Sequence, residues 1–143
     1  MSVFVTVGST EHTALVDAVL SEPCLKALSD NGYNKLVIQF GKSVWNRPFS
    51  YCSSHDVDIS AFDFKASIED DITASSLVIS HAGAGTILDV LRTPKPLIGY
   101  LYACSSADLA RTIQTKDFSS LKPFPPFDGS HFQRLIDEEM GFI

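Results

Sequence analysis

Apolar positions along the chain fall into two patterns, short continuous runs and longer segments with helical spacing. The continuous runs are rich in β-branched and aromatic residues, and they predict strands. They cover residues 3–7, 35–40, 57–64, 77–80 and 97–102. Strands that are apolar along their whole length are buried on both faces, which is typical of a parallel sheet.

Helical spacing appears between and after these runs. It predicts helices over residues 15–20, 23–31, 87–91, 105–113 and 130–140, and a short capped segment at 67–70. Ser105, with Asp108 three positions later, has the spacing of a capping box. Residues 42–56 show no period and predict a loop.

The alternation of strands with helices predicts a Rossmann-like α/β fold, a parallel sheet with helices on both faces. We expect residues 1–121 to form this domain. Residues 122–143 are expected to add a Pro-rich connector and a C-terminal helix.

Composition and charge narrow the range of functions. Lys and Arg total 11 against 17 Asp and Glu, and the net charge of -6 argues against a broad nucleic-acid surface. An anion site must therefore be local.

The three cysteines lack metal-like spacing, so we expect no metal site. The start lacks the basic stretch of a signal peptide and no apolar run is long enough to span a bilayer, which predicts a cytosolic protein that reaches a membrane only through a partner.

Two loops rich in small residues each follow a predicted strand. In parallel sheets, ligands bind at the carboxyl ends of strands, where helix N-termini favour phosphate. Alternatively, such a loop is only a turn that uses the conformational freedom of glycine. Small residues and hydroxyls fill both loops: Gly8, Ser9 and Thr10 in the first, and Gly83, Ala84, Gly85 and Thr86 in the second.

His81 and Asp89 flank the second loop. His81 is placed to donate to a phosphate oxygen or to carry a proton, or else to make a structural hydrogen bond. Asp89, one turn into the helix, is placed to reach sugar hydroxyls, or else to interact with the helix dipole. Leu88 stands where a dinucleotide fingerprint needs its third glycine, which disfavours a nucleotide-dependent oxidoreductase. The sequence identifies no catalytic base.

Longer stretches around these loops resemble a known family. Residues 4–10, 35–42, 77–92 and 95–98 resemble the catalytic, donor-binding subunits of the eukaryotic UDP-N-acetylglucosamine transferase. That enzyme adds the second GlcNAc to dolichol-diphosphate-GlcNAc on the cytosolic face of the endoplasmic reticulum. Its subunit is similar to the donor-binding half of MurG-like GT-B glycosyltransferases, the C-terminal domain of glycosyltransferase family 28.

The resemblance implies a UDP-GlcNAc site that uses both loops. The first loop would approach the donor diphosphate, and residues 83–86 would present backbone N–H groups to it. His81 would border the same pocket, and Asp89 would hold the ribose hydroxyls. Uracil would lie near the backbone of Phe64 and Lys65. The diphosphate charge would be held without a bound metal or other cofactor.

The resemblance also implies a heteromeric enzyme. The acceptor-binding half is absent from this sequence, so a membrane-anchored partner subunit would supply it and would bring dolichol-diphosphate-GlcNAc. The chain would then be recruited to the cytosolic face of the endoplasmic reticulum membrane. No nucleic-acid partner is implied.

The sequence departs from the family after residue 98. There the family continues through a longer strand, an Asn-rich segment and a helix, whereas here Ile98 runs directly into Gly99 and Tyr100. We therefore expect a sheet shortened after its fifth strand, without the segment that contacts the transferred sugar. An alternative function follows, a non-catalytic nucleotide-binding or regulatory partner.

Overall fold

The computed structural model describes residues 1–101, 103–123, 125 and 130–140. The strands are β1 (Ser2–Thr6), β2 (Lys35–Gln39), β3 (Ser50–Cys52), β4 (Asp58–Phe62), β5 (Leu77–Ser80) and β6 (Leu97–Gly99). The helices are α1 (Thr13–Val19), α2 (Glu22–Asp30), α3 (Glu69–Ala74), α4 (Ala84–Arg92), α5 (Ser106–Thr115) and α6 (Ser130–Glu139), with a 3-10 turn, η1, at Phe118–Ser120. Within the described part of the chain, no helix is long and apolar enough to cross a membrane.

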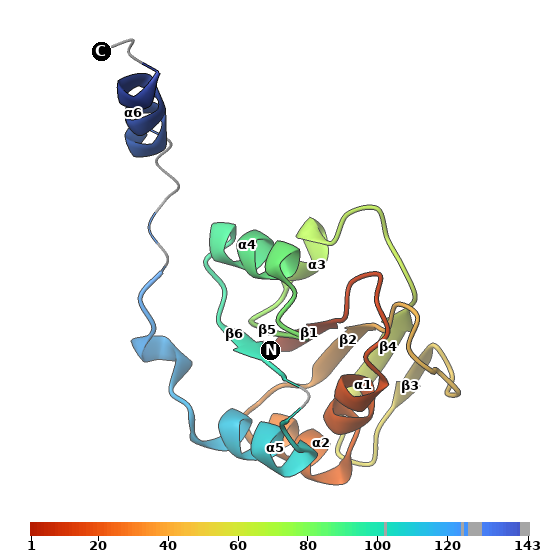
Figure 1. Cartoon of the computed structure of the whole chain (residues 1–143). Helices are drawn as coiled ribbons and strands as arrows, with labels where there is room; N and C mark the ends of the chain where they lie inside the picture. Colours follow the sequence, from red (N-terminus) through yellow and green to blue (C-terminus); the bar gives the residue numbers. More distant parts are fainter. Residues whose placement is uncertain (102, 124, 126–129, 141–143) are drawn as a thin grey trace.

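The strands form one sheet in the order β3-β4-β2-β1-β5-β6. All neighbours are parallel except β3, which runs antiparallel to β4. Helices α1, α2 and α5 cover one face of the sheet, and α3 and α4 cover the other (Figure 1). The prediction of a Rossmann-like α/β fold is confirmed.

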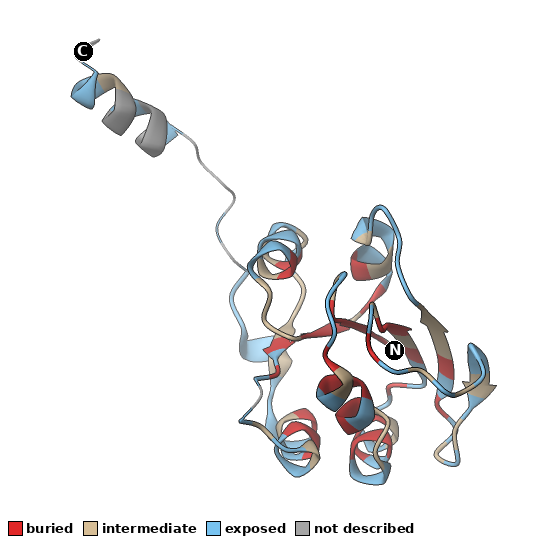
Figure 2. Ribbon diagram, turned by 45° about the vertical axis from the view of Figure 1, so that its right-hand side comes forward, coloured by how far each residue is buried: buried red, intermediate tan, exposed pale blue. Residues whose placement is uncertain are grey.

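The core consists of two layers that meet at the central strand β1. Val3 and Val5 are fully buried on the side of α1, α2 and α5, in the larger apolar cluster. Phe4 points to the other side, where it packs with Ile72 of α3 and Val90 of α4. The sheet and the inner faces of its helices are accordingly the buried parts of the molecule (Figure 2). Continuous apolarity along β1 thus reflects burial on both faces.

The prediction of a loop over residues 42–56 is wrong at β3. This strand has only three residues, and its neighbours in sequence show no period. It forms because Tyr51 pairs with Ile59 of β4, so its conformation depends on a partner strand rather than on local pattern.

The last predicted strand is also shorter than expected. It ends at Gly99, although the Tyr100 N–H still donates to the Ser80 carbonyl oxygen of β5 at 2.8 Å, and farther on the Cys104 N–H donates to the Leu101 carbonyl oxygen at 2.9 Å. Residue 102 of the predicted strand lies outside the described residues. The predicted capping box is confirmed, since Ser105 and Asp108 exchange both hydrogen bonds at the start of α5.

Helix α6 is present where predicted and stands apart from the sheet in Figure 1. Residues 124, 126–129 and 141–143 of the predicted C-terminal segment lie outside the described residues.

The loops that follow the parallel strands meet at one edge of the sheet, which we call the carboxyl edge. Gly41, just after β2, fixes two of these loops together. Its φ is +56°, and a Cβ atom there would lie 2.5 Å from the Thr10 carbonyl oxygen and 2.7 Å from that of Gly8. A side chain at this position would therefore push the first small-residue loop away from β2.

We predict that Gly41→Ala lowers the free energy of unfolding by about 3 kcal/mol, because the energy of the strained backbone and the energy of the steric clash both destabilise the folded state. Urea denaturation measures this. Gly85→Ala is the matched control, since a Cβ atom at Gly85 meets nothing within 4 Å. Equal midpoints for Gly41→Ala and the unmodified chain would contradict the prediction.

Candidate functional site

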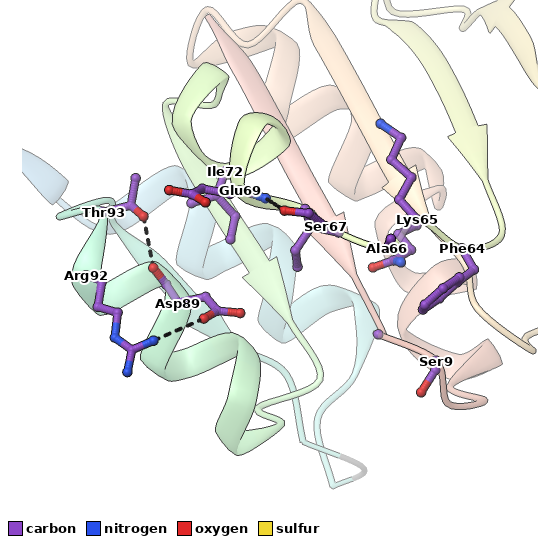
Figure 3. Close-up of a pocket in the computed structure, with 13 residues that line it drawn as sticks. Ser9, Phe64, Lys65, Ala66, Ser67, Glu69, Ile72, Asp89, Arg92 and Thr93 are labelled. Atoms are coloured by element: carbon purple, nitrogen blue, oxygen red, sulfur yellow. Dashed lines mark hydrogen bonds and ion pairs between the residues drawn. The ribbon is translucent and has the colours of Figure 1, made fainter.

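A hollow of about 350 Å³ opens at the carboxyl edge, between the loop after β1, the loop after β4 and helix α4 (Figure 3). Phe64 lies beside Ser9 on one side of it, and Asp89 and Arg92 lie on the other. The lining residues are Gly8, Ser9, Gln39, Phe64, Lys65, Ala66, Ser67, Ile68, Glu69, Ile72, Asp89, Arg92 and Thr93.

Hydrogen bonds hold the floor of the hollow in place. The buried Thr6 hydroxyl donates to Gln39 Oε1 at 2.6 Å and accepts the Gly8 N–H at 2.9 Å. The Thr10 N–H and hydroxyl both donate to the Val7 carbonyl oxygen. Because these groups are turned inward, the exposed Ser9 is what the first loop offers to a ligand.

Charged side chains of both signs line the walls. Lys65 Nζ lies 2.9 Å from Asp71 Oδ1 and 4.1 Å from the centroid of the Phe62 ring, which fixes its position. On α4, Arg92 Nη1 lies 3.8 Å from Asp89 Oδ1. The two cations suit an anionic ligand, and the Asp89 carboxylate is an acceptor for hydroxyl groups.

The second small-residue loop forms the N-terminus of α4. Ala82 adopts a left-handed conformation with φ of 65°, and Gly83 is the N-cap without a side-chain hydrogen bond. Ala84 and Gly85 are exposed. The first turn of α4 therefore presents backbone N–H groups that no cap side chain occupies, an arrangement that favours an anion.

His81 lies between the two loops. A Cβ atom at Gly83 would lie 2.6 Å from His81 Nε2, and one at Gly8 would lie 3.8 Å from His81 Cε1. The histidine ring thus packs against Gly83 and close to Gly8, and Gly83 has no room for a side chain. The two loops lie close together because β1 and β5, the strands that they follow, are paired in parallel.

His12 is a residue that sequence analysis missed. It is buried to 3% exposure, its Nδ1 accepts the Leu15 N–H at 3.1 Å as the N-cap of α1, and its ring centroid lies 6.3 Å from that of His81. Burial lowers the pKa of His12, and the nearby charge of His81 lowers it further. Its position just before a predicted helix was the available signal for a cap.

The structure brings together only part of the predicted set of site residues. Lining the hollow are Gly8, Ser9, Phe64, Lys65 and Asp89. Placed at the adjoining carboxyl edge, outside the lining, are Thr10, His81, Gly83, Ala84, Gly85 and Thr86.

Sequence analysis also missed several lining residues, among them Gln39, Ser67 and Glu69. Of the missed lining residues, Arg92 and Thr93 could have been predicted, because they follow Asp89 by three and four positions and share its face of the helix. Among the residues that the structure describes, no group of three or more His, Cys, Asp or Glu side chains is placed to hold a metal ion.

Comparisons with known proteins agree with the motif resemblance. Residues 2–116 match the family model described as glycosyltransferase family 28 C-terminal domain. The proteins named UDP-N-acetylglucosamine transferase subunit ALG13 from Mus musculus and Homo sapiens are 42% and 41% identical to this chain. These matches cover 66% and 67% of this chain but only 8% of each relative.

A relative of similar extent is the protein of the same name from Saccharomyces cerevisiae. It is 28% identical, with 96% of this chain and 95% of the relative covered. The alignment runs over 191 positions, whereas this chain has 143 residues, so the relative carries residues that this chain lacks.

Solved structures confirm the fold. The NMR solution structure of ALG13 superposes with a TM-score of 0.70 at 27% identity and covers 94% of both chains. The glycotransferase of kitacinnamycin superposes with a TM-score of 0.52 at 15% identity, over 34% of its own length, and shows the fold alone.

We predict that acid destabilises the protein through His12. Since its folded pKa lies below the ordinary 6.5, the unfolded chain binds the proton more readily, and stability is lost as the pH falls from about 7 through the folded pKa. His12→Asn keeps an N-cap side chain and removes the titration. Urea denaturation from pH 7 to about pH 5 should show a shallower fall for this variant. Identical slopes would count against a role for His12.

Proposed function

Since this chain belongs to the glycosyltransferase family 28 C-terminal domain family, we propose that it is the donor-binding subunit of a UDP-GlcNAc transferase. Its acceptor is dolichol-diphosphate-GlcNAc. The transfer adds the second GlcNAc of the lipid-linked N-glycan precursor. The observation that supports this most is the hollow at the carboxyl edge, because Ser9, Phe64 and Asp89 line it together and all lie within the matched segment. The names of the relatives support UDP-N-acetylglucosamine as the donor.

In this proposal, residues 1–121 bind the nucleotide with the contacts that the geometry offers. Uracil lies against Phe64 and the backbone at Lys65. The Asp89 carboxylate accepts hydrogen bonds from the ribose hydroxyls, and its ion pair with Arg92 holds it in position. The diphosphate lies between Ser9 and the N-terminus of α4.

Transfer then follows from how the leaving group is held. The bond between the anomeric carbon of GlcNAc and the diphosphate oxygen breaks, and a new bond to the acceptor hydroxyl oxygen forms as that hydroxyl gives its proton to a base on the acceptor-binding partner. Negative charge grows on the departing UDP, and the unoccupied N–H groups of residues 84 and 85 stabilise it in place, together with the α4 dipole.

The acceptor half belongs to a partner in this proposal. A membrane-anchored subunit carries the acceptor site and recruits the chain to the cytosolic face of the endoplasmic reticulum. This is consistent with the word "subunit" in the names of the relatives. The chain spans less than a tenth of the mouse and human relatives, so their remaining activities are not carried over.

A second candidate is a nucleotide-binding or regulatory partner without transferase activity. The residues that this chain lacks relative to the yeast relative favour it, as does the end of β6 at Gly99. Every residue that lines the hollow precedes β6, so nucleotide binding survives in this alternative while sugar contacts are lost.

We predict that Gly85→Asp weakens UDP binding by about a hundredfold or more, because it places a carboxylate beside the diphosphate. The fold should be retained, since the space around Gly85 is open. Isothermal titration calorimetry measures the affinity, and Gly85→Ala, which adds bulk without charge, is the control. Unchanged affinity in a folded Gly85→Asp variant would rule out a diphosphate at this helix N-terminus.

A transfer assay with the membrane subunit present distinguishes the two candidates. We predict that UDP and UDP-GlcNAc bind with affinities within about a factor of three, because the sugar contacts are missing. The second candidate predicts little GlcNAc transfer by the unmodified chain and recovery when a family-like segment is inserted after Ile98, whereas the first candidate predicts transfer by the unmodified chain. Robust transfer by the unmodified chain, with clear preference over UDP-glucose, would show that other residues form the sugar site.

A further inference from the structure

Large apolar side chains are exposed at the carboxyl edge, next to the donor hollow. Val44, Phe49 and Phe64 are 61%, 64% and 61% exposed. The first two lie between β2 and β3, and Phe64 follows β4. Apolar groups gathered at one edge mark a surface that contacts another molecule or a membrane.

Residues 42–49, which we call the aromatic loop, are held by a stack of rings. Phe40 is buried to 8% exposure, and the Trp45 ring stacks on it with centroids 5.2 Å apart. The Phe49 ring lies 6.2 Å from Phe40 at an interplanar angle of 15°. The buried ring thus anchors the exposed one, so Phe49 is presented outward by a built scaffold.

Hydrogen bonds fix the start of the same loop. The Ser43 N–H donates to the Phe40 carbonyl oxygen at 2.8 Å, and the Ser43 hydroxyl accepts the His12 N–H at 2.8 Å. The Val44 N–H donates to the Thr13 hydroxyl at 3.2 Å. Val44 is therefore held at the surface by contacts to α1 and its cap.

The indole N–H of Trp45 is a hydrogen-bond donor without an acceptor within this scaffold. Its indole Nε1 is buried and finds no acceptor among the described residues. A change of surroundings that brings an acceptor to this N–H is therefore favourable, and tryptophan is enriched where an apolar ring and a polar partner meet at membrane interfaces.

The charge around the loop is opposite to that of the whole chain. Residues 31–55 contain no Asp or Glu, although the chain has 17 of them, whereas they include Lys35, Lys42 and Arg47. The Arg47 guanidinium lies 5.9 Å from the centroid of the Trp45 ring and 3.9 Å from an Asp17 oxygen. Outside the loop, Asp63 lines a second pocket, distinct from the donor hollow, together with Trp45 and Phe49. The loop itself carries only cations, in a chain whose net charge of -6 repels anionic surfaces elsewhere.

We propose that the aromatic loop contacts the surface of a bilayer that contains anionic lipids. Val44 and Phe49 enter the region between headgroups and acyl chains, and Lys42 and Arg47 lie at the lipid phosphates. Apolar and aromatic residues with a cationic rim are the composition that favours such a surface. The inference rests on the proposed function in one respect, that a lipid-linked acceptor gives a reason to turn this edge toward the membrane.

Trp45 is the only tryptophan of the chain, so its fluorescence reports on this loop alone. With the full chain and vesicles of phosphatidylcholine containing about 30% phosphatidylserine, we expect a blue shift of the emission and quenching by brominated lipids. Vesicles of phosphatidylcholine alone should bind more weakly, and added salt should weaken binding to the anionic vesicles.

Matched variants separate the two parts of the surface. Val44→Ser and Phe49→Ser should each lower vesicle partitioning by about tenfold, and Lys42→Gln with Arg47→Gln should remove the preference for anionic vesicles. Val44→Ser leaves the ring stack intact, so it tests the idea even if Phe49→Ser unfolds. Leu121→Ser is the control, since Leu121 is 55% exposed but lies beyond η1, and it should leave partitioning unchanged.

Three outcomes would overturn the proposal. One is an absence of vesicle binding, and another is sedimentation with vesicles while Trp45 emission stays constant, which would assign binding to another surface. The third is a Trp45 response to the acceptor-binding subunit in detergent but not to vesicles, which would make the loop a protein interface. UDP affinity measured on the same samples keeps this test separate from the donor site: normal UDP binding without vesicle binding defeats only the membrane contact.

Discussion

Burial of β1 on both faces is the constraint on which the rest of the molecule depends. Val3 and Val5 belong to one layer of the core and Phe4 to the other, so β1 fixes where both helix layers lie. Its neighbours β2 and β5 pair with it along their length. Since all three strands run in the same direction, they deliver their following loops to one edge, and the candidate site exists because three buried strands end together.

The sequence predicts the elements whose formation depends on residues that are close together in the chain. The central strands are apolar throughout, and the Ser105–Asp108 capping box needs only residues three apart, so both were visible. Strand β3 was missed because its three residues become a strand only by pairing with β4. The same reason explains why only part of the lining of the hollow could be predicted. Asp89 was visible from its position in a helix, whereas Ser67 and Glu69 join the lining only because the loop after β4 folds toward α4.

Two histidines show how packing adds chemistry that spacing does not reveal. His12 and His81 are far apart in sequence, yet their rings lie 6.3 Å apart because β1 and β5 are adjacent. His12 is held by the N-terminus of α1, and its lowered pKa favours the neutral ring. His81 in turn packs against Gly83. The two rings together thus link the cap of α1 to the loop before α4.

Under the proposed function, the order of the lining residues along the chain separates nucleotide binding from sugar transfer. The lining of the hollow runs from Gly8 to Thr93 and is complete before β6 begins. Its scaffold is the central part of the sheet, where β1, β2 and β5 are paired on both sides. Strand β6 is at the edge, and a change after it leaves those pairings untouched. A segment missing there removes whatever it would contact at a ligand but not the strands that support the hollow, so in the proposed function the two capacities depend on separable parts of one domain.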